Sequence, residues 1–207
     1  NEENEPITAH IVTVEDDKWR FLRHKLSPAF TSGKLKLMYS IVGHKSQPFV
    51  SAIEKASKGS KAIEIREIAS KFVLDIVSSV AFGMEANTLG DEHPELLMCL
   101  KNVTEDFSAL FIIFGIAFPK LTRFLKLRQF RREVSDFFMN VVGENIRRRD
   151  ESKEVRHDFL DMLVQLKNKG SIDGEFSTET RKLTLNECIA QSFIFMFGGT
   201  ATSSGTI

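Results

Sequence analysis

Apolar residues recur with a helical period along most of this 207-residue chain. The clearest case is segment 63–82, which ends at Gly83. Its apolar residues are spaced by three or four and predict one buried helix face: Ile65, Ile68, Phe72, Ile76 and Val80. No segment shows the alternation that is typical of a strand, so we expect an all-α chain.

Cap and break signals outline further helices. Asp16 and Asp17 are candidate caps for a helix over 18–26, and Pro48 should break or restart the helix that follows. Pro, Gly and charged residues bound the other expected helices, which cover 31–56, 91–108, 125–149 and 157–169.

Charged residues indicate the environment of two of these helices, the one over 125–149 and the one over 157–169. The arginines at 147–149 suit the carbonyl end of the long charged helix. Asp158 and Asp161 are three residues apart on the next helix, a spacing typical of a solvated helix edge.

The last helix has the strongest start signal. Thr184 and Glu187 fit a capping box, in which each side chain accepts a free backbone amide of the other residue. From 189 to 197 the sequence is apolar almost all round. We therefore expect this helix to cross the middle of its domain.

Composition restricts the class of protein. Apolar residues make up 42% of the chain, and 28 basic residues balance 28 acidic ones, so the chain is globular and net charge does not favour nucleic acid. The 18 Phe against one Trp and one Tyr favour an apolar interior. Cys99 and Cys188 lie far apart in apolar segments, so we expect no disulfide and a reducing compartment. The His and Cys spacings do not predict a metal site.

The two ends of the chain look like cuts in a longer protein. The sequence starts without Met and stops at Ile207 inside a helical pattern. Its longest apolar run, 109–118, is about half as long as a membrane span needs to be. We therefore expect an internal fragment, without a signal peptide of its own.

Trp19 and Arg23 form the first candidate site. They are four residues apart and lie on one helix face, so an indole N–H and a guanidinium could bind a carboxylate together. The alternative is a Trp that anchors the core under a stacked Arg. Neighbouring basic residues could dock an acidic partner or form a solvated face: Lys18, Arg20, His24 and Lys25.

Gly198, Gly199 and Thr202 form the second candidate site. Two glycines inside a helix cost roughly 2 kcal/mol relative to alanines, which suggests that something approaches the backbone closely. Thr202 lies one turn beyond Gly198, so its hydroxyl should face the same ligand. The alternative is a helix–helix contact through small residues.

Several motifs, in this order and at these separations, resemble the cytochrome P-450 haem-thiolate monooxygenases over essentially the whole chain. Residues 19–23 (WRFLR) look like the WxxxR helix of the family, and 26–36 (LSPAFTSGKLK) look like its microsomal and insect detoxification branch. Residues 158–161 (DFLD) and 190–193 (AQSF) resemble the same branch. Residues 198–204 (GGTATSS) resemble its oxygen-activating helix.

The resemblance implies haem b as cofactor and a role for each candidate. Trp19 and Arg23 would donate to a haem propionate, Gly198 would lie against the haem face, and Thr202 would hydrogen-bond dioxygen and help to deliver protons. The implied substrate-binding residues are His10, Ile11, Val12, Phe107, Phe111, Ile194 and Phe197. Segment 109–118 would be a lid that often touches the membrane in this family.

Two departures from the family pattern matter. The family usually has an acidic residue before the Thr, whereas this chain has Ala201, which cannot relay a proton. A Gly in place of the usual Ala at 198 should only enlarge the space over the haem. The Glu-x-x-Arg pair and the Cys loop that ligates iron are not in the sequence, and neither Cys99 nor Cys188 has the surroundings of that ligand. We expect the ligand outside this chain, which alone should be inactive.

The resemblance further implies a fold and partners. Residues 1–207 would be the helical part of one P-450 domain, with its small β part elsewhere. The parent would oxidise lipophilic molecules, xenobiotic or endogenous, with electrons from NADPH–cytochrome P-450 reductase, and cytochrome b5 is a further partner to consider. It would sit on the cytoplasmic face of the endoplasmic reticulum membrane through an N-terminal anchor. The alternatives are a non-catalytic lipophile-binding or interaction protein, and a degenerate gene copy.

Overall fold

A computed structural model describes residues 4–59, 62–106, 117–173 and 181–207. Within these ranges the chain is helical and has no strand, which confirms the all-α prediction. The longer helices are α1 (Asp16–Leu26), α2 (Ser32–Ser57), α3 (Ile65–Phe82), α4 (Pro94–Asp106), α6 (Pro119–Phe124), α7 (Arg132–Ser152), α8 (Phe159–Asn168) and α9 (Leu185–Ser204). Short 3-10 helices join some of them: η1 (Pro6–Thr8), η2 (Ser27–Phe30) and η3 (Thr88–Gly90).

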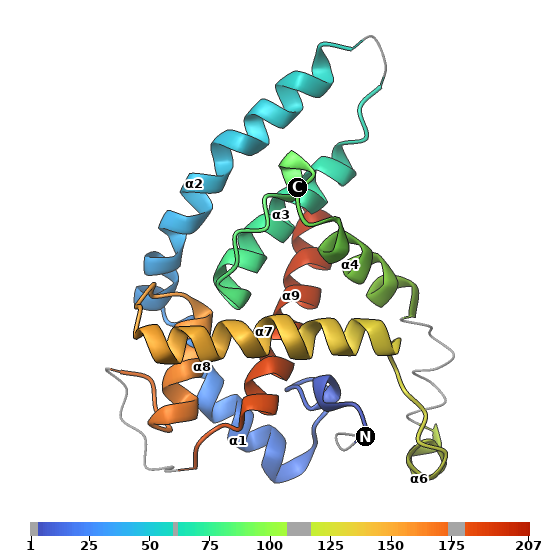
Figure 1. Ribbon diagram of the computed structural model, residues 1–207, viewed down its shortest axis with the longest axis vertical. Coiled ribbons are helices and arrows are strands. Elements are labelled where there is room, and N and C mark those ends of the chain that lie inside the picture. The colour runs from blue at the N-terminus through green and yellow to red at the C-terminus, as the bar shows by residue number, and fades with distance from the viewer. Residues whose placement is uncertain (1–3, 60–61, 107–116, 174–180) are drawn as a thin grey trace.

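Helix α9 runs through the middle of the molecule, where α7 crosses it (Figure 1). It packs against α3, α7, α8 and η1. The amide of Glu187 donates to Thr184 Oγ1 at 3.2 Å, and the amide of Thr184 donates to Glu187 Oε2 at 2.9 Å. Residues 188–193 are all buried. The capping box and the central position are therefore confirmed.

Phenylalanine rings fill the space around α9. Phe193 meets Phe130 and Phe138 edge to face, with ring centroids 5.1 Å apart in both pairs. Phe138 of α7 in turn meets Phe82 of α3 at 5.6 Å. A Phe ring needs no hydrogen-bond partner when it is buried, whereas Tyr and Trp do. This core therefore suits a sequence so rich in Phe.

Helix α3 ends as predicted but buries a different face. Gly83 adopts φ +62°, a left-handed conformation that glycine tolerates. The predicted stripe is only partly covered, since Ile65 is 45% exposed and Phe72 is half-buried. The residues that α3 buries are mostly small: Ala69, Val73, Leu74, Asp75, Ser78, Ser79, Ala81 and Phe82. The physical reason is that α3 lies between two helices: its small residues let α9 approach, and Phe72 stacks on Phe49 of α2 at 4.2 Å.

Two local predictions about α1 and α2 are wrong. Neither Asp16 nor Asp17 caps α1: the N-cap position is Glu15, and no side chain caps the helix. The two aspartates lie in the first turn, where they favour the positive end of the helix dipole. Helix α2 continues through Pro48, which is exposed, so water can satisfy the carbonyl that loses its amide partner.

Helix α7 begins at Arg132 rather than at Leu125. The Glu5 carboxylate is buried and accepts the amides of Gln129 at 2.8 Å and Phe130 at 2.9 Å. These amides bond a side chain from the other end of the chain and not a helical carbonyl. This long-range contact keeps the segment before Arg132 out of the helix.

Arg149, Asp158 and Asp161 form a buried ion cluster where α7 meets α8. Arg149 Nη1 donates to Asp158 Oδ1 at 3.0 Å, to Asp158 Oδ2 at 3.1 Å, and to Asp161. The three side chains are 5%, 0% and 7% exposed. The prediction of a solvated edge is therefore wrong. The turn between the helices brings the start of α8 against the last turn of α7. Arg149 balances one of the two carboxylate charges, and the Arg156 guanidinium supplies a second cation 3.8 Å from Asp158 Oδ2.

Candidate functional site

The last turns of α9 present an open face made by Gly198, Ala201 and Thr202, all of which are exposed. A Cβ built on Gly198 would meet no atom within 4 Å, whereas one on Gly199 would lie 3.3 Å from Val77 Cγ2 of α3. The two glycines therefore have different roles. Gly199 allows close helix packing, as the alternative interpretation held, and Gly198 leaves space on the open face.

The Thr202 hydroxyl is oriented by its own helix. Thr202 Oγ1 donates to the carbonyl of Gly198 at 2.7 Å. Because the proton is used in this bond, the remaining lone pairs of the oxygen are available to accept a hydrogen bond from the open face. To donate toward a ligand, the hydroxyl must rotate away from the carbonyl. Ala201 beside it contributes no polar group.

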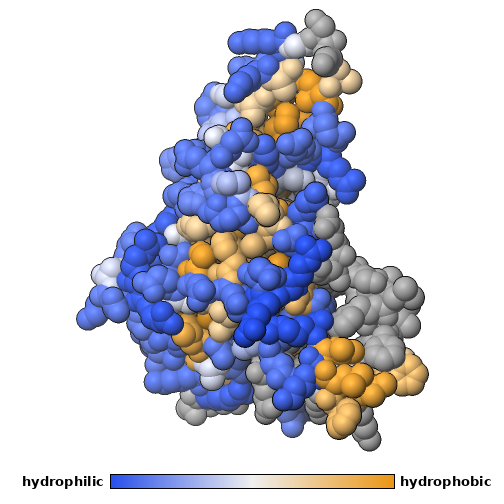
Figure 2. All heavy atoms as spheres, turned by 45° about the vertical axis from the view of Figure 1, so that its right-hand side comes forward, coloured by the Kyte–Doolittle hydropathy of each residue, from blue (hydrophilic) through white to orange (hydrophobic). Residues whose placement is uncertain are grey.

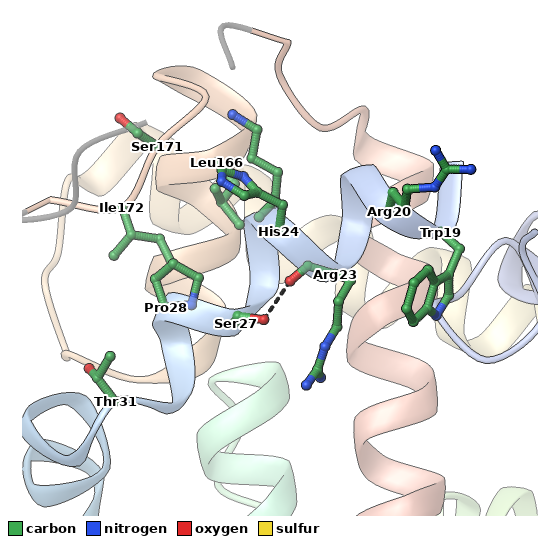
Figure 3. A pocket seen from close by; sticks show the side chains of 11 residues that line it. Trp19, Arg20, Arg23, His24, Ser27, Pro28, Thr31, Leu166, Ser171 and Ile172 are labelled. Carbon is green, nitrogen blue, oxygen red and sulfur yellow. Dashed lines mark hydrogen bonds between the residues drawn. The ribbon is translucent and has the colours of Figure 1, made fainter. Parts of the chain in front are cut away.

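Trp19 and Arg23 point to the same side of α1, and Arg20 and His24 point to the other (Figure 3). Trp19 is 44% exposed and so does not anchor the core. Within the described ranges the Arg23 guanidinium has no side-chain partner. The structure thus brings together two donors that are free to bind an anionic group.

A surface pocket lies against α1 and is lined by both basic and apolar side chains. Its lining is Trp19, Arg20, Arg23, His24, Lys25, Ser27, Pro28, Thr31, Leu166, Ser171 and Ile172 (Figure 3). The Lys25 side chain is buried, and its Nζ donates to the carbonyl of Gly170. Lys25 therefore does not belong to an exposed docking face, which corrects that part of the sequence interpretation.

The expected substrate-binding residues lie in different environments. His10 is buried with its ring 6.1 Å from that of Phe193, and burial lowers the pKa of His10 to about 4. Ile11 is half-buried, and Val12 is 72% exposed. On α9, Ile194 and Phe197 are half-buried. Two further expected residues lie outside the described ranges: Phe107 and Phe111.

Sequence reasoning missed two buried polar residues that hold the segment around His10. Gln191 of α9 bonds the backbone of Ala9 and Ile11, and Glu5 bonds the start of α7. A lone Gln in the apolar run of the last helix is a signal that could have singled out Gln191. Glu5 has no comparable signal in the sequence.

The two cysteines are free and buried. Burial raises the pKa of Cys99 to about 11 and that of Cys188 to about 12. Both therefore remain neutral thiols, whereas a metal ligand must be a thiolate. In the described part of the chain no group of His, Cys, Asp and Glu could hold a metal ion.

The residues present fit the haem that the resemblance implies. Gly198 and Thr202 leave one stripe of α9 uncovered, and no Cβ occupies the space beside Gly198. Trp19 and Arg23 offer donors suited to carboxylates, which are the polar groups at the haem edge. The donor set of α1 and the open face of α9 are thus compatible with a flat apolar cofactor that carries carboxylates.

Comparison with known proteins agrees with these features. Residues 1–207 match the family model of cytochrome P450. Over the whole chain, the sequence is 38% identical to cytochrome P450 6A1 of Musca domestica and 35% identical to cytochrome P450 6a8 of Drosophila melanogaster. It is 32% identical to the probable cytochrome P450 6a18 of Drosophila melanogaster. The chain spans 40–41% of the length of these relatives. It belongs to the cytochrome P450 family, as its motifs predicted.

Proposed function

We propose that residues 1–207 are the helical part of a single P450 domain in a haem-dependent monooxygenase that oxidises lipophilic small molecules. The observation that carries this proposal is the uncovered stripe of α9, where Gly198 leaves open space and Thr202 presents its hydroxyl. The family match over the whole chain supports it. The alternative of a non-catalytic lipophile-binding protein explains neither feature.

Haem b, when bound, supplies an iron centre that activates dioxygen, with a thiolate ligand from outside this chain. Trp19 and Arg23 bind and orient its propionates through the indole N–H and the guanidinium. Gly198 would lie against the flat cofactor and leave more space above it than the Ala that is usual in the family, because it has no side chain there.

Thr202 holds a proton at Oγ1, which it now donates to the carbonyl of Gly198. Rotation about its side chain would redirect that proton to the open face. Because Ala201 supplies no carboxylate, resupply of the proton must come from water that reaches this exposed face.

The substrate is a lipophile held by Val12, Ile194 and Phe197, with Phe107 and Phe111 as further residues that the resemblance implies. His10 stays uncharged at neutral pH, since burial lowers its pKa to about 4. The neighbouring aromatic ring of Phe193 adds to the apolar character of this region. These side chains favour an apolar ligand over a charged one.

Electrons come from NADPH through the reductase, which docks on the exposed basic face of α1, and cytochrome b5 would use the same face. Arg20 is exposed and can take this role, whereas Lys25 is buried and Lys18 is half-buried beside Glu187, with 3.9 Å between Nζ and Oε1. Reversing the charge of Arg20 should raise the reductase concentration that gives half-maximal rate, and added salt should weaken the difference. An equal requirement in the variant and the parent at low salt would contradict this docking face.

We place the parent on the cytoplasmic face of the endoplasmic reticulum membrane, anchored by a segment outside this chain. None of the helices in the described ranges has the length and hydropathy to span a bilayer. Exposed apolar side chains gather at α6 and its flanks, at the lower right of Figure 2: Phe118, Leu121, Phe124, Leu125 and Leu127. Phe124→Ser should weaken binding of the anchor-free parent to phosphatidylcholine vesicles about tenfold, and Val155→Ser, which changes another exposed side chain, should not.

Haem content tests the proposed function directly. We expect the full-length parent to purify with haem and to oxidise a lipophile only with NADPH and reductase. Arg23→Leu should lose most of the haem, and Arg20→Leu, on the other side of α1, should keep it. A wild-type parent without haem would favour the lipophile-binding alternative, and equal haem in both variants would contradict the role of Arg23.

A further inference from the structure

Gln191 of α9 makes three hydrogen bonds through its side chain, and it has no exposed surface. Its Oε1 accepts the amide of Ile11 at 3.0 Å. Its Nε2 donates to the carbonyls of Ala9 and of Glu187, each at 3.2 Å. One side chain thus pairs with a backbone donor and a backbone acceptor that are about 180 residues away in sequence.

Further hydrogen bonds hold the residues on either side of the segment that Gln191 contacts. Glu5 bonds two amides before α7, and Thr13 Oγ1 donates to the carbonyl of His10 at 3.0 Å. The His10 ring packs against Phe193, two residues beyond Gln191. Val12 is the exposed apolar residue of this segment, with 72% of its surface accessible.

Gln191 lies on the same stripe of α9 as the open face. Gly198 follows it by seven residues and Thr202 by eleven, which are spacings that return to one side of a helix. At 1.5 Å per residue, Gln191 is about 10 Å from Gly198 along the axis. The stripe is therefore covered by residues 9–11 at Gln191 and uncovered at Gly198 and Thr202.

We propose that Gln191 is a positioning residue that sets the shape of the substrate pocket, because it holds residues 9–11 on α9 and so places Val12 at the border of the open face. This inference rests on the proposed function, since it takes that face as the substrate site. A side-chain amide carries its donor and its acceptor on two separate atoms, so that Gln191 can bond the backbone of Ala9 and of Ile11 at the same time. Met has a similar length but can do neither, and Glu keeps only the acceptor.

The test uses the full-length parent with Gln191→Met and a matched control, Ser192→Ala. Ser192 is equally buried on the same helix, but its hydroxyl has no hydrogen-bond partner in the described part of the chain. We expect amide hydrogen exchange at Ile11 to be about tenfold faster in Gln191→Met and unchanged in the control. The affinity for Nile red, a lipophilic fluorescent probe, should fall at least about threefold in Gln191→Met alone, while the haem content stays that of the wild type.

The outcomes separate the inference from the proposed function. Unchanged exchange at Ile11 would overturn the positioning role. If exchange at Ile11 is faster in Gln191→Met but the affinity for Nile red is unchanged, Gln191 only stabilises the segment. That result would overturn its proposed effect on the shape of the pocket. If the wild type itself does not bind Nile red, the lipophile pocket fails, and the exchange data still decide whether Gln191 holds the segment.

If the Gln191→Met protein does not fold, the proposal can still be tested by comparing the exchange rates of two amides in the wild type. The amide of Val12 donates no hydrogen bond within the described ranges, whereas that of Ile11 donates to Gln191 Oε1. Ile11 should therefore exchange at least about tenfold more slowly than Val12. Equal rates would overturn the proposal without any variant.

Discussion

Replacing Arg149 by Met should unfold this helical part more readily than any surface substitution. Arg149 is 5% exposed at its side chain and forms ion pairs with both Asp158 and Asp161, whose side chains are 0% and 7% exposed. Met keeps most of the aliphatic volume but removes the cation. Two carboxylates would then be left buried without the cation that contacts both, although the Arg156 guanidinium would remain 3.8 Å from Asp158 Oδ2.

The expected loss is about 3–5 kcal/mol, the usual cost of removing one partner from a buried ion pair. A domain is stable by only about 5–15 kcal/mol, so a large part of its stability would be lost. Burial already raises the pKa of Asp158, although hydrogen bonds from Arg149 oppose this. Without Arg149 the pKa of Asp158 should rise further. The folded variant then binds more protons than its unfolded chain, so its stability falls as pH rises through that higher pKa.

Urea unfolding of the full-length parent, followed by far-ultraviolet circular dichroism at pH 5 and pH 7.5, measures both effects. The penalty of Arg149→Met should be largest at pH 7.5 and smaller at pH 5. Arg148→Met is the matched control, because Arg148 is the preceding residue of α7 and is exposed. It should change stability by less than about 0.5 kcal/mol. An equal effect of the two substitutions, or a penalty for Arg149→Met that does not depend on pH, would refute this reasoning.

Three further predictions concern the site and its support. Burial lowers the pKa of His10 from 6.5 to about 4. The folded state should therefore lose up to about 3 kcal/mol of stability as pH falls from 6.5 to 4, because the unfolded chain binds a proton that the buried ring does not. His10→Phe should flatten this part of the profile of urea stability against pH, and parallel profiles of variant and parent would disprove the lowered pKa of His10. Ala201→Glu should lower the peroxide released per NADPH consumed, because it restores a carboxylate beside the hydroxyl of Thr202; equal coupling would exclude a relay at this position. Gly198→Ala should be more stable than Gly199→Ala by about 1 kcal/mol in thermal unfolding, since only the new methyl group at 199 would crowd Val77 of α3. A Gly199→Ala protein that is the more stable of the two would contradict the close packing of Gly199 on α3.

The sequence alone was sufficient to predict the features that depend on residues close together in the chain. The capping box of Thr184 and Glu187 and the left-handed end of α3 at Gly83 involve residues a few positions apart. The central course of α9 followed from its apolar residues, because a helix that is apolar all round must be buried on every side. The motifs also identified the family, which the comparison over the whole chain confirmed.

Long-range contacts decided the rest. Whether a glycine approaches another helix depends on what faces it, and Val77 faces Gly199 while open space faces Gly198. In the same way, Glu5 determines where α7 begins from more than 120 residues away. From sequence alone, a carboxylate or an amide is expected to be exposed to water, because burial without a partner costs free energy. Only the tertiary structure supplies the partners that make burial favourable, as Arg149 does for Asp158 and Asp161, and as the backbone of residues 9–11 does for Gln191.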